Sequence, residues 1–333
     1  IILFHLDVAV LTGGFIGVDV FFVISGYLIT RIIVSSLGAR QFSFRDFYIR
    51  RATRILPALF VTILLALSAA AYLQQPAALL HTAQEAISAL FSVSNIFYWT
   101  DSSYWAPSAE KYPLLHTWSL GVEEQFYLVY PLLLVFAYRL AGTRGVIVLL
   151  LGITILGTFA TEAVGRIDYS AAFYLTPLRF YEFAFGGLAA MLPGLNAMQK
   201  SRGLSAAASA FGLFLIVFAS LRFNGLTAKP GIYMLVPVMG TLLVLLAGPS
   251  PVAKLLLINP LMSWLGKISY SLYLTHWPII VFYRYFFGSS LTAKEQSALF
   301  VAILIAGTIL NLTVERRFRL THDGKKTANG VSS

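Results

Sequence analysis

Apolar runs of about 20 residues, the length that spans a bilayer as a helix, recur along the whole chain and constrain its fold more than any other feature. Lipid offers no partners for backbone polar groups, so repeated spans of this kind must be helical. Of the 333 residues, 58% are hydrophobic and 11% are charged, whereas soluble domains carry about 25% charged residues. We therefore predict an all-α polytopic membrane protein.

The runs predict about ten transmembrane helices, because each apolar stretch of roughly 20 residues accounts for one crossing. The predicted spans are 1–12 (cut short), 15–35, 55–74, 118–140, 145–165, 173–193, 204–222, 231–248, 262–286 and 297–317. The chain starts within the first of them, so we expect a truncated N-terminus. Residues 80–100 are too polar for an easy span and are expected to form an amphipathic or re-entrant helix at the outer surface.

An arginine-rich loop between the second and third spans orients the molecule. It contains only one acidic residue, Asp46, beside Arg31, Arg40, Arg45, Arg50, Arg51 and Arg54. Cytoplasmic loops collect Lys and Arg, so we predict that this loop and, by alternation, both termini are cytoplasmic. The same rule explains the net charge of +10 without a nucleic-acid partner. Polar residues 320–333 are expected to form a disordered cytoplasmic tail.

Several ionisable side chains lie inside the predicted spans, which points to a functional site within the membrane. A carboxylate at the centre of a spanning helix costs roughly 2.5–3.5 kcal/mol on insertion scales, so it persists where it faces protein or a wet cavity. At ~1.5 Å rise per residue, these groups could share one depth below the outer surface: His5, Asp19, Glu123, Glu124, Arg179, Glu182 and His276. A cavity that carries out proton chemistry would have this composition.

Each of these residues also has a structural interpretation. A lone His5 on an apolar helix could be a hydrogen-bonded core residue. Glu123 and Glu124 point about 100° apart on a helix, so they cannot both face one cavity. Arg179 and Glu182 have the i, i+3 spacing of a helical ion pair, and Asp19 could anchor its helix near the interface.

Missing motifs narrow the chemistry. The chain has no cysteine, which excludes disulfides, thiolate metal sites and cysteine nucleophiles. It has no Walker A loop, no HExxH, no GxSxG and no paired metal-ligand spacing. We therefore predict neither a metal site nor ATP-driven, zinc-protease or serine-hydrolase chemistry.

Six segments, in this order, resemble one family over nearly the whole chain. In these motifs the chain resembles the membrane-bound acyltransferase family 3. This family includes bacterial sugar O-acyltransferases that modify O-antigen (lipopolysaccharide), peptidoglycan and exopolysaccharides. The segments are GGFIGVDVFFVISGYLIT (13–30), FYIRRATRILPAL (47–59), LHTWSLGVEEQFYLVYP (115–131), TPLRFYEFAFGGLAA (176–190), KISYSLYLTHWP (267–278) and VERRFR (314–319).

The resemblance implies a transmembrane acyltransferase domain over residues 1–319, in the bacterial inner (cytoplasmic) membrane with several passes. The implied activity is an O-acetyltransferase that moves an acyl group, most often acetyl, from cytoplasmic acyl-CoA to a hydroxyl of an envelope glycan or lipid-linked sugar. Acetyl-CoA would be a donor substrate, with no bound cofactor. In larger relatives an esterase-like domain follows VERRFR, where the family more often has proline at the position of Arg317.

The resemblance also assigns residues. His5 matches a histidine essential for transfer, and its partner arginine would lie ahead of Ile1. Glu123 matches the glutamate of the WSLxVEEQFY motif. Arg51 and Arg54 match the cytoplasmic RxxRIxP motif.

These assignments suggest a mechanism. Arg50, Arg51 and Arg54 would hold the phosphates of acyl-CoA. His5 would act as the base or would itself accept the acyl group, with Glu123 or Asp19 orienting its imidazole. Acceptor-side contacts would come from His116, Glu124, Tyr127, Tyr270 and His276.

Two rival functions use the same polar residues. A proton-coupled secondary transporter would relay protons through its intramembrane carboxylates and histidines. That class predicts inverted repeats, which the sequence does not show. A flippase-type or scaffold protein would tolerate loss of His5, whereas the enzyme would not.

Overall fold

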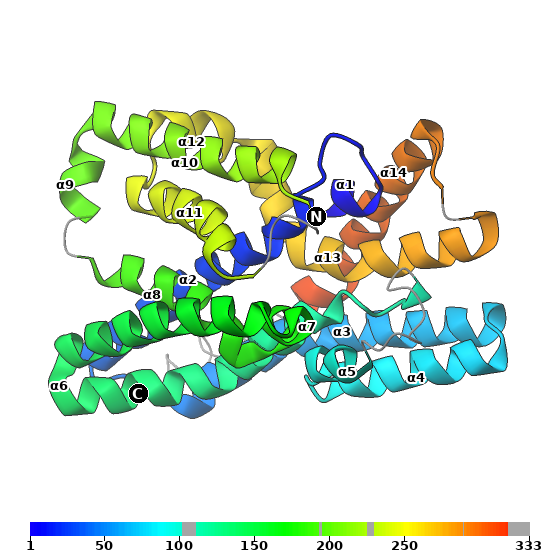
Figure 1. Cartoon of the computed structure of the whole chain (residues 1–333), viewed down its shortest axis with the longest axis horizontal. Coiled ribbons are helices and arrows are strands. Elements are labelled where there is room, and N and C mark those ends of the chain that lie inside the picture. Colours follow the sequence, from blue (N-terminus) through cyan, green and yellow to red (C-terminus); the bar gives the residue numbers. More distant parts are fainter. Residues whose placement is uncertain (102–110, 193–194, 225–229, 289, 319–333) are drawn as a thin grey trace, which may run out of the picture.

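The computed structural model describes residues 1–101, 111–192, 195–224, 230–288 and 290–318, and these residues form helices without any strand (Figure 1). The helices in chain order are α1 (Ile2–His5), η1 (Gly14–Ile16), α2 (Gly17–Gly38), α3 (Phe44–Leu73), α4 (Pro76–Leu90), α5 (Ser94–Asp101), α6 (Thr117–Gly165), α7 (Tyr169–Tyr174), α8 (Thr176–Met191), α9 (Leu195–Lys200), α10 (Arg202–Arg222), η3 (Ile232–Met234), α11 (Leu235–Ala247), α12 (Pro251–Leu256), α13 (Pro260–Phe287), α14 (Ala293–Leu310) and the π-helical turn η4 (Asn311–Glu315). The predicted tail, residues 320–333, lies outside the described residues.

The prediction of an all-α membrane protein is confirmed at the level of helix length and hydropathy. Within the described ranges, five helices are long and apolar enough to cross a bilayer: Gly14–Gly38, Phe44–Leu73, Thr117–Gly165, Arg202–Arg222 and Ala293–Phe318. The third of these contains two predicted spans, because the backbone leaves helical geometry at Ala141 and Gly142 and folds back there (Figure 1). The ten-span count and the cytoplasmic termini stay predictions.

Two local predictions were wrong. Residues 1–12 do not form one helical segment, because α1 ends at His5 and Asp7 takes a left-handed φ of 56°. Residues 80–100 form two helices instead of one. The break falls at Ser92, where φ is 59°, and the Ser92 hydroxyl hydrogen-bonds the Glu124 carboxylate. A tertiary contact on another helix therefore stabilises a turn that local apolar periodicity does not reveal.

Helices α2, α6 and α8 form the centre of the molecule, and α2 and α8 approach each other closely (Figure 1). Glycine makes this approach possible. A Cβ on Gly26 of α2 would overlap the Phe183 carbonyl, and one on Gly186 of α8 would overlap the Val23 carbonyl. Small residues at helix interfaces are a common packing device in membranes, where burial of apolar surface does not drive association.

Helix α13 lies beside α14 and reaches the same centre from the other end of the molecule. Asn259 caps its first turn by accepting a hydrogen bond from Met262 N–H, and Pro260 occupies the next position. Arg284, near its end, donates to the backbone carbonyl of His5 (3.0 Å). This bond helps to fix the short helix α1 against α13.

Helices α4 and α5 are joined to the segment before α6 by a polar cluster. His81 bridges the carboxylates of Glu85 (3.4 Å) and Asp101 (3.1 Å), and its ring stacks on Tyr112 at a centroid distance of 4.5 Å. Glu85 also accepts from Leu114 N–H (2.8 Å). The hydrogen bond to Glu85 raises the pKa of His81 despite partial burial.

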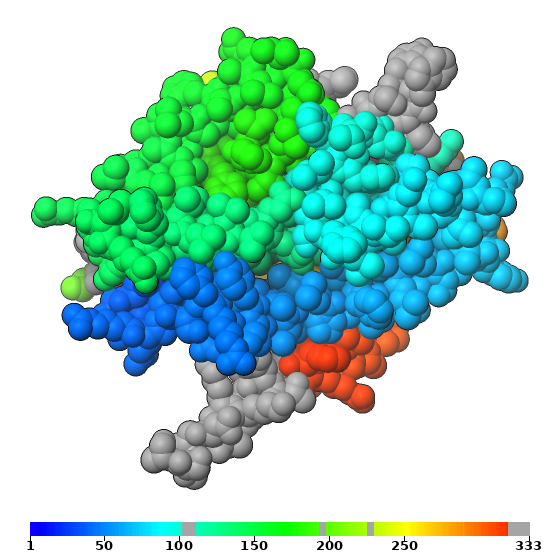
Figure 2. Space-filling model, turned by 90° about the horizontal axis from the view of Figure 1, so that it is seen from below, coloured from blue at the N-terminus to red at the C-terminus, as the bar shows by residue number. Residues whose placement is uncertain are grey.

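Apolar side chains cover the outward faces of the long helices. Figure 2 shows the face on which α3, α4, α5 and α6 lie at the surface. Among the large apolar side chains exposed on α3 and α6 are Phe60, Leu64, Leu65, Phe136, Leu156 and Phe159. Such continuous apolar surface is expected where a helix bundle meets lipid.

Candidate active site

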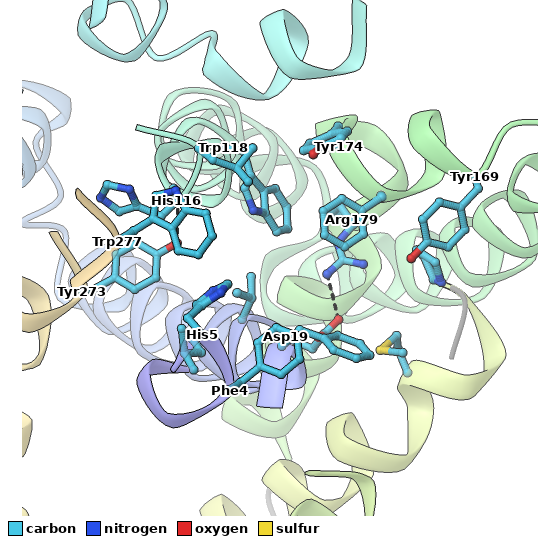
Figure 3. Close-up of a pocket in the computed structure, with 17 residues that line it drawn as sticks. Phe4, His5, Asp19, His116, Trp118, Tyr169, Tyr174, Arg179, Tyr273 and Trp277 are labelled. Atoms are coloured by element: carbon cyan, nitrogen blue, oxygen red, sulfur yellow. Dashed lines mark hydrogen bonds and ion pairs between the residues drawn. The ribbon is translucent and has the colours of Figure 1, made fainter. Parts of the chain in front are cut away.

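A cavity of about 270 Å³ lies where α1, α2, α7, α8 and α13 meet the first turn of α6 (Figure 3). We call it the histidine cavity, because His5 and His116 line it. Asp19 and Arg179 supply its charged groups. Most of the remaining wall is aromatic and is formed by Phe4, Phe15, Trp118, Tyr169, Phe173, Tyr174, Tyr273 and Trp277.

His5 is the last residue of α1 and is held among rings from α13. The Trp277 ring meets it edge-on, with centroids 4.5 Å apart, and the His276 ring lies 5.4 Å away. Trp277 is itself fixed, since its indole N–H donates to the Tyr112 carbonyl (2.7 Å). The α1–α13 contact thus places the histidine ring at the cavity wall (Figure 3).

Asp19 lines the same cavity, but its carboxylate is directed to Arg179 instead of His5 (Figure 3). The Arg179 guanidinium lies 2.8 Å from Asp19 and 3.3 Å from Glu182, and all three side chains are at most 3% exposed. Rings surround the cation as well, with centroids 5.7–5.9 Å away at Phe22, Trp118 and Phe173. The i, i+3 pair predicted from the sequence is therefore present, and Asp19 joins it from α2.

Glu123 lies in a second cavity of about 210 Å³, which we call the arginine cavity because Arg54 lines it. The Ser25 hydroxyl donates to the Glu123 carboxylate (3.0 Å), and Tyr127 also bonds to it. Tyr270 lines this cavity too and donates to the Ile55 carbonyl (2.9 Å). Ile1, Val18 and Tyr273 border both cavities, so the two adjoin.

Glu124 faces a third, more open space of about 550 Å³ between α3, α5 and α6, which we call the lateral groove and which shares Ile55 and Tyr127 with the arginine cavity. The divergence of the two glutamates agrees with their predicted angular separation. Arg51 lines the lateral groove and places its guanidinium over the Phe47 and Tyr127 rings, 5.8 Å from each centroid.

The predicted cytoplasmic arginine group is therefore divided. Arg54 borders the arginine cavity and Arg51 the lateral groove, while Arg50 lines none of these three spaces.

The remaining predicted acceptor-side residues also separate. His116 precedes α6 and lines the histidine cavity, where its backbone carbonyl accepts from the Tyr273 hydroxyl (2.6 Å). His276 is completely buried behind it, with ring centroids 5.6 Å apart. Tyr270 lines the arginine cavity, and Tyr127 lines both that cavity and the lateral groove.

Two features of the site were not evident in the sequence. Trp277 and Tyr273 lie within KISYSLYLTHWP, but aromatic residues are common in membrane helices, so nothing singled them out. The pairing of Arg179 with Asp19 depends on the contact between α2 and α8. Among the described residues, no cluster of three or more His, Asp or Glu has the arrangement of a metal site.

Several helices are long and apolar enough to cross a bilayer, and buried charged side chains line a cavity between helices, which together indicate a multi-pass membrane protein. Residues 1–314 match the family model described as an acyltransferase domain, and the chain belongs to this family, acyltransferase family 3. The resemblance seen in the six sequence motifs is confirmed.

Curated relatives carry a similar sequence. The O-acetyltransferase OatA of Staphylococcus aureus (strain NCTC 8325 / PS 47) is 33% identical over 344 residues, covering 98% of this chain and 55% of the relative. The putative peptidoglycan O-acetyltransferase YrhL of Bacillus subtilis (strain 168) is 32% identical, with 84% and 46% covered. The peptidoglycan O-acetyltransferase OatA of Listeria monocytogenes (serovar 1/2a) is 32% identical, with 84% and 47% covered.

The chain therefore spans about half the length of these relatives. No solved structure matches it significantly. The names of the relatives favour an enzyme over the transporter and flippase alternatives.

Proposed function

We propose that this chain is the membrane domain of an O-acetyltransferase of the bacterial cytoplasmic membrane. Acetyl-CoA on the cytoplasmic side would be the donor, and a hydroxyl of a cell-wall glycan would be the acceptor. Family membership supports the reaction type, and the similarity to two relatives named as peptidoglycan O-acetyltransferases supports peptidoglycan as the glycan.

One observation carries the proposal: the arginine cavity adjoins the histidine cavity through Ile1, Val18 and Tyr273. Arg54, the last arginine of the loop predicted to be cytoplasmic, borders the first. His5 and His116 border the second. An acyl thioester entering past Arg54 would therefore reach His5 without leaving the protein.

The chemistry follows from the groups present. The acceptor hydroxyl oxygen forms a bond to the acyl carbon, and the carbon–sulfur bond breaks. His5 takes the hydroxyl proton and returns it to the departing thiolate, which leaves as free CoA. Alcohol attack needs a base that is neutral near physiological pH, and imidazole meets this requirement.

The aromatic wall of the histidine cavity suits a sugar as the acceptor. Trp118, Phe173 and Tyr174 offer flat apolar surfaces, which can pack against the apolar face of a sugar ring. The Asp19–Arg179 pair offers hydrogen bonds at the same wall. These groups would orient one hydroxyl toward His5.

A transfer assay in liposomes tests this function on the protein at its natural length. Labelled acetyl-CoA is supplied only on the side of the arginine-rich loop, and label is followed into peptidoglycan fragments on the other side. We expect wild-type protein to transfer label, and His5→Ala to lose at least about 100-fold of the rate, the usual contribution of a general base. Undiminished transfer by folded His5→Ala protein would contradict the mechanism.

A further inference from the structure

The orientation of the His5 ring is a problem that the proposed function leaves open. A catalytic histidine is usually oriented by a buried hydrogen-bond acceptor on the side away from the substrate. Neither expected carboxylate does this here, because Asp19 is paired with Arg179 and Glu123 is bonded by Ser25 and Tyr127. Within the described part of the chain, the His5 ring forms no hydrogen bond to a carboxylate.

His276 occupies the position where such an acceptor would be found. It is 0% exposed, does not line the histidine cavity, and lies next to His5 with a ring-centroid distance of 5.4 Å. Two imidazole rings joined by one hydrogen bond have a similar centroid distance. That distance is the sum of the two ring radii and the N···N distance of roughly 3 Å. His276 therefore lies behind the cavity wall, next to both His5 and His116.

The hydrogen bonding of His276 fixes which of its nitrogens carries the proton. Its Nδ1 lies 2.6 Å from the Tyr273 carbonyl, and a carbonyl only accepts, so Nδ1 must be the donor. In the neutral ring Nε2 then has a free lone pair. Among the described residues Nε2 has no hydrogen-bond partner although it is buried. A buried acceptor left unpaired costs about 1–3 kcal/mol, so a donor is expected there.

We propose that His276 is the positioning residue of the site and that its Nε2 accepts a hydrogen bond from a ring N–H of His5, directly or through one water. This inference rests on the proposed function of His5. The arrangement leaves the other nitrogen of His5 unprotonated and available to the acceptor hydroxyl. When His5 takes that proton, His276 keeps its own proton on Nδ1 and stabilises the imidazolium as an acceptor.

A neutral acceptor suits this environment. A carboxylate behind His5 would have to be buried as an anion, with a desolvation cost that only a cation or several donors could offset. A neutral imidazole carries no such cost. Trp277 limits the ring from another direction through its edge-on contact, so His5 is held by one polar and one apolar neighbour from α13.

Two substitutions separate this role from a structural one. His276→Asn places an amide N–H near the Nδ1 position, which preserves the bond to the Tyr273 carbonyl but removes the acceptor that faces His5. His276→Gln places an amide oxygen near the Nε2 position and preserves the acceptor instead. Folding of each variant is checked by its elution and thermal unfolding in detergent, and kcat and KM for acetyl-CoA are measured on the protein at its natural length.

We expect folded His276→Asn to lose about 100-fold or more in kcat with little change in KM, and His276→Gln to stay within about tenfold of wild type, a difference of ~1.4 kcal/mol. The reverse order would show that the bond to Tyr273 matters and would overturn the inference. Equal rates in the two variants, high or low, would overturn it too. If His5→Ala abolishes transfer while His276→Asn does not, only this inference fails. If His5→Ala transfers normally, the proposed function of His5 fails.

Discussion

At the scale of single residues, the buried charges show what sequence can and cannot predict. The spacing of Arg179 and Glu182 predicts their pairing, because residues three apart on a helix are neighbours. It contains no information about Asp19, which lies 160 positions away and joins through the contact of α2 with α8. The resulting group has two carboxylates around one guanidinium, so the cation has to compensate both.

This arrangement predicts a large loss of stability when the cation is removed. Arg179→Met leaves Asp19 and Glu182 buried without a positive partner, which typically costs about 3–5 kcal/mol. Adding Glu182→Gln should restore part of the lost stability, since a neutral amide then replaces one of the two uncompensated carboxylates. Thermal unfolding in detergent provides the measurement.

Arg166→Met is the matched control for this prediction. Arg166 pairs with Glu162 at 3.1 Å, but its side chain is 73% exposed, so the change should stay below about 1 kcal/mol. Equal losses for Arg179→Met and Arg166→Met would mean that the buried group does not depend on its charge balance.

At the scale of helices, periodicity predicted which face of a helix a side chain lies on better than it predicted where the helix begins and ends. The turn of about 100° per residue correctly separated Glu123 from Glu124, which face the arginine cavity and the lateral groove. The end of α1 at His5 was not predicted. The break at Ser92 was not predicted either, because the Ser92 hydroxyl bonds to Glu124 on a distant helix. The motifs around Gly26 and Gly186 were visible, but their role in helix packing required the structure.

The α2–α8 contact makes a prediction about these glycines. Gly26→Ala would place a methyl group against the Phe183 carbonyl, so the helices must separate, and we expect a loss of about 1–3 kcal/mol from overpacking. Transfer activity should fall as well, because Asp19 and Arg179 meet across the same contact. Thermal unfolding and the transfer assay measure the two effects.

Gly152→Ala, in the second half of α6, is the control. No atom lies within 4 Å of the Cβ that this change would add, and alanine in a helix is about 0.5–1 kcal/mol better than glycine. The two substitutions should therefore have opposite signs. A destabilising Gly152→Ala or a neutral Gly26→Ala would refute the account of close helix packing.

At the scale of the whole molecule, composition was enough for the fold class, and the ordered motifs were enough for the family. Of the seven groups predicted to share one depth, His5, Asp19 and Arg179 line one cavity together with His116, whereas Glu123 and Glu124 line two other spaces. The division of the arginines was not predictable. Arg50 and Arg54 are four residues apart and lie on the same side of α3, one turn from each other, whereas Arg51 is turned about 100° from Arg50. Which of them meets a cavity depends on how α3 packs against α6 and α13.

Orientation in the membrane can be tested directly, because the chain has no cysteine and each introduced thiol is the only one. Gln41 and Lys294 are exposed, one in the arginine-rich loop and the other at the start of α14. We expect a membrane-impermeant maleimide to label Lys294→Cys in intact spheroplasts and Gln41→Cys only after permeabilisation. Permeabilised samples of both variants serve as the labelling control.

The outcome also determines whether α4 and α5 cross the bilayer. If residues 80–100 lie at the outer surface, the six predicted spans from 118–140 to 262–286 separate the outer end of α3 from Lys294. Because that number is even, Lys294 is extracellular. If residues 80–100 span the bilayer, every later segment is inverted. Lys294→Cys is then labelled only after permeabilisation, as Gln41→Cys is. His5 and His116 would keep their cavity in either case, but α13 would then run in the opposite direction to that expected from the arginine-rich loop. Protection of Gln41→Cys in intact spheroplasts is the result that the proposed passage of an acyl group past Arg54 requires, whereas the labelling of Lys294→Cys determines the direction of α13.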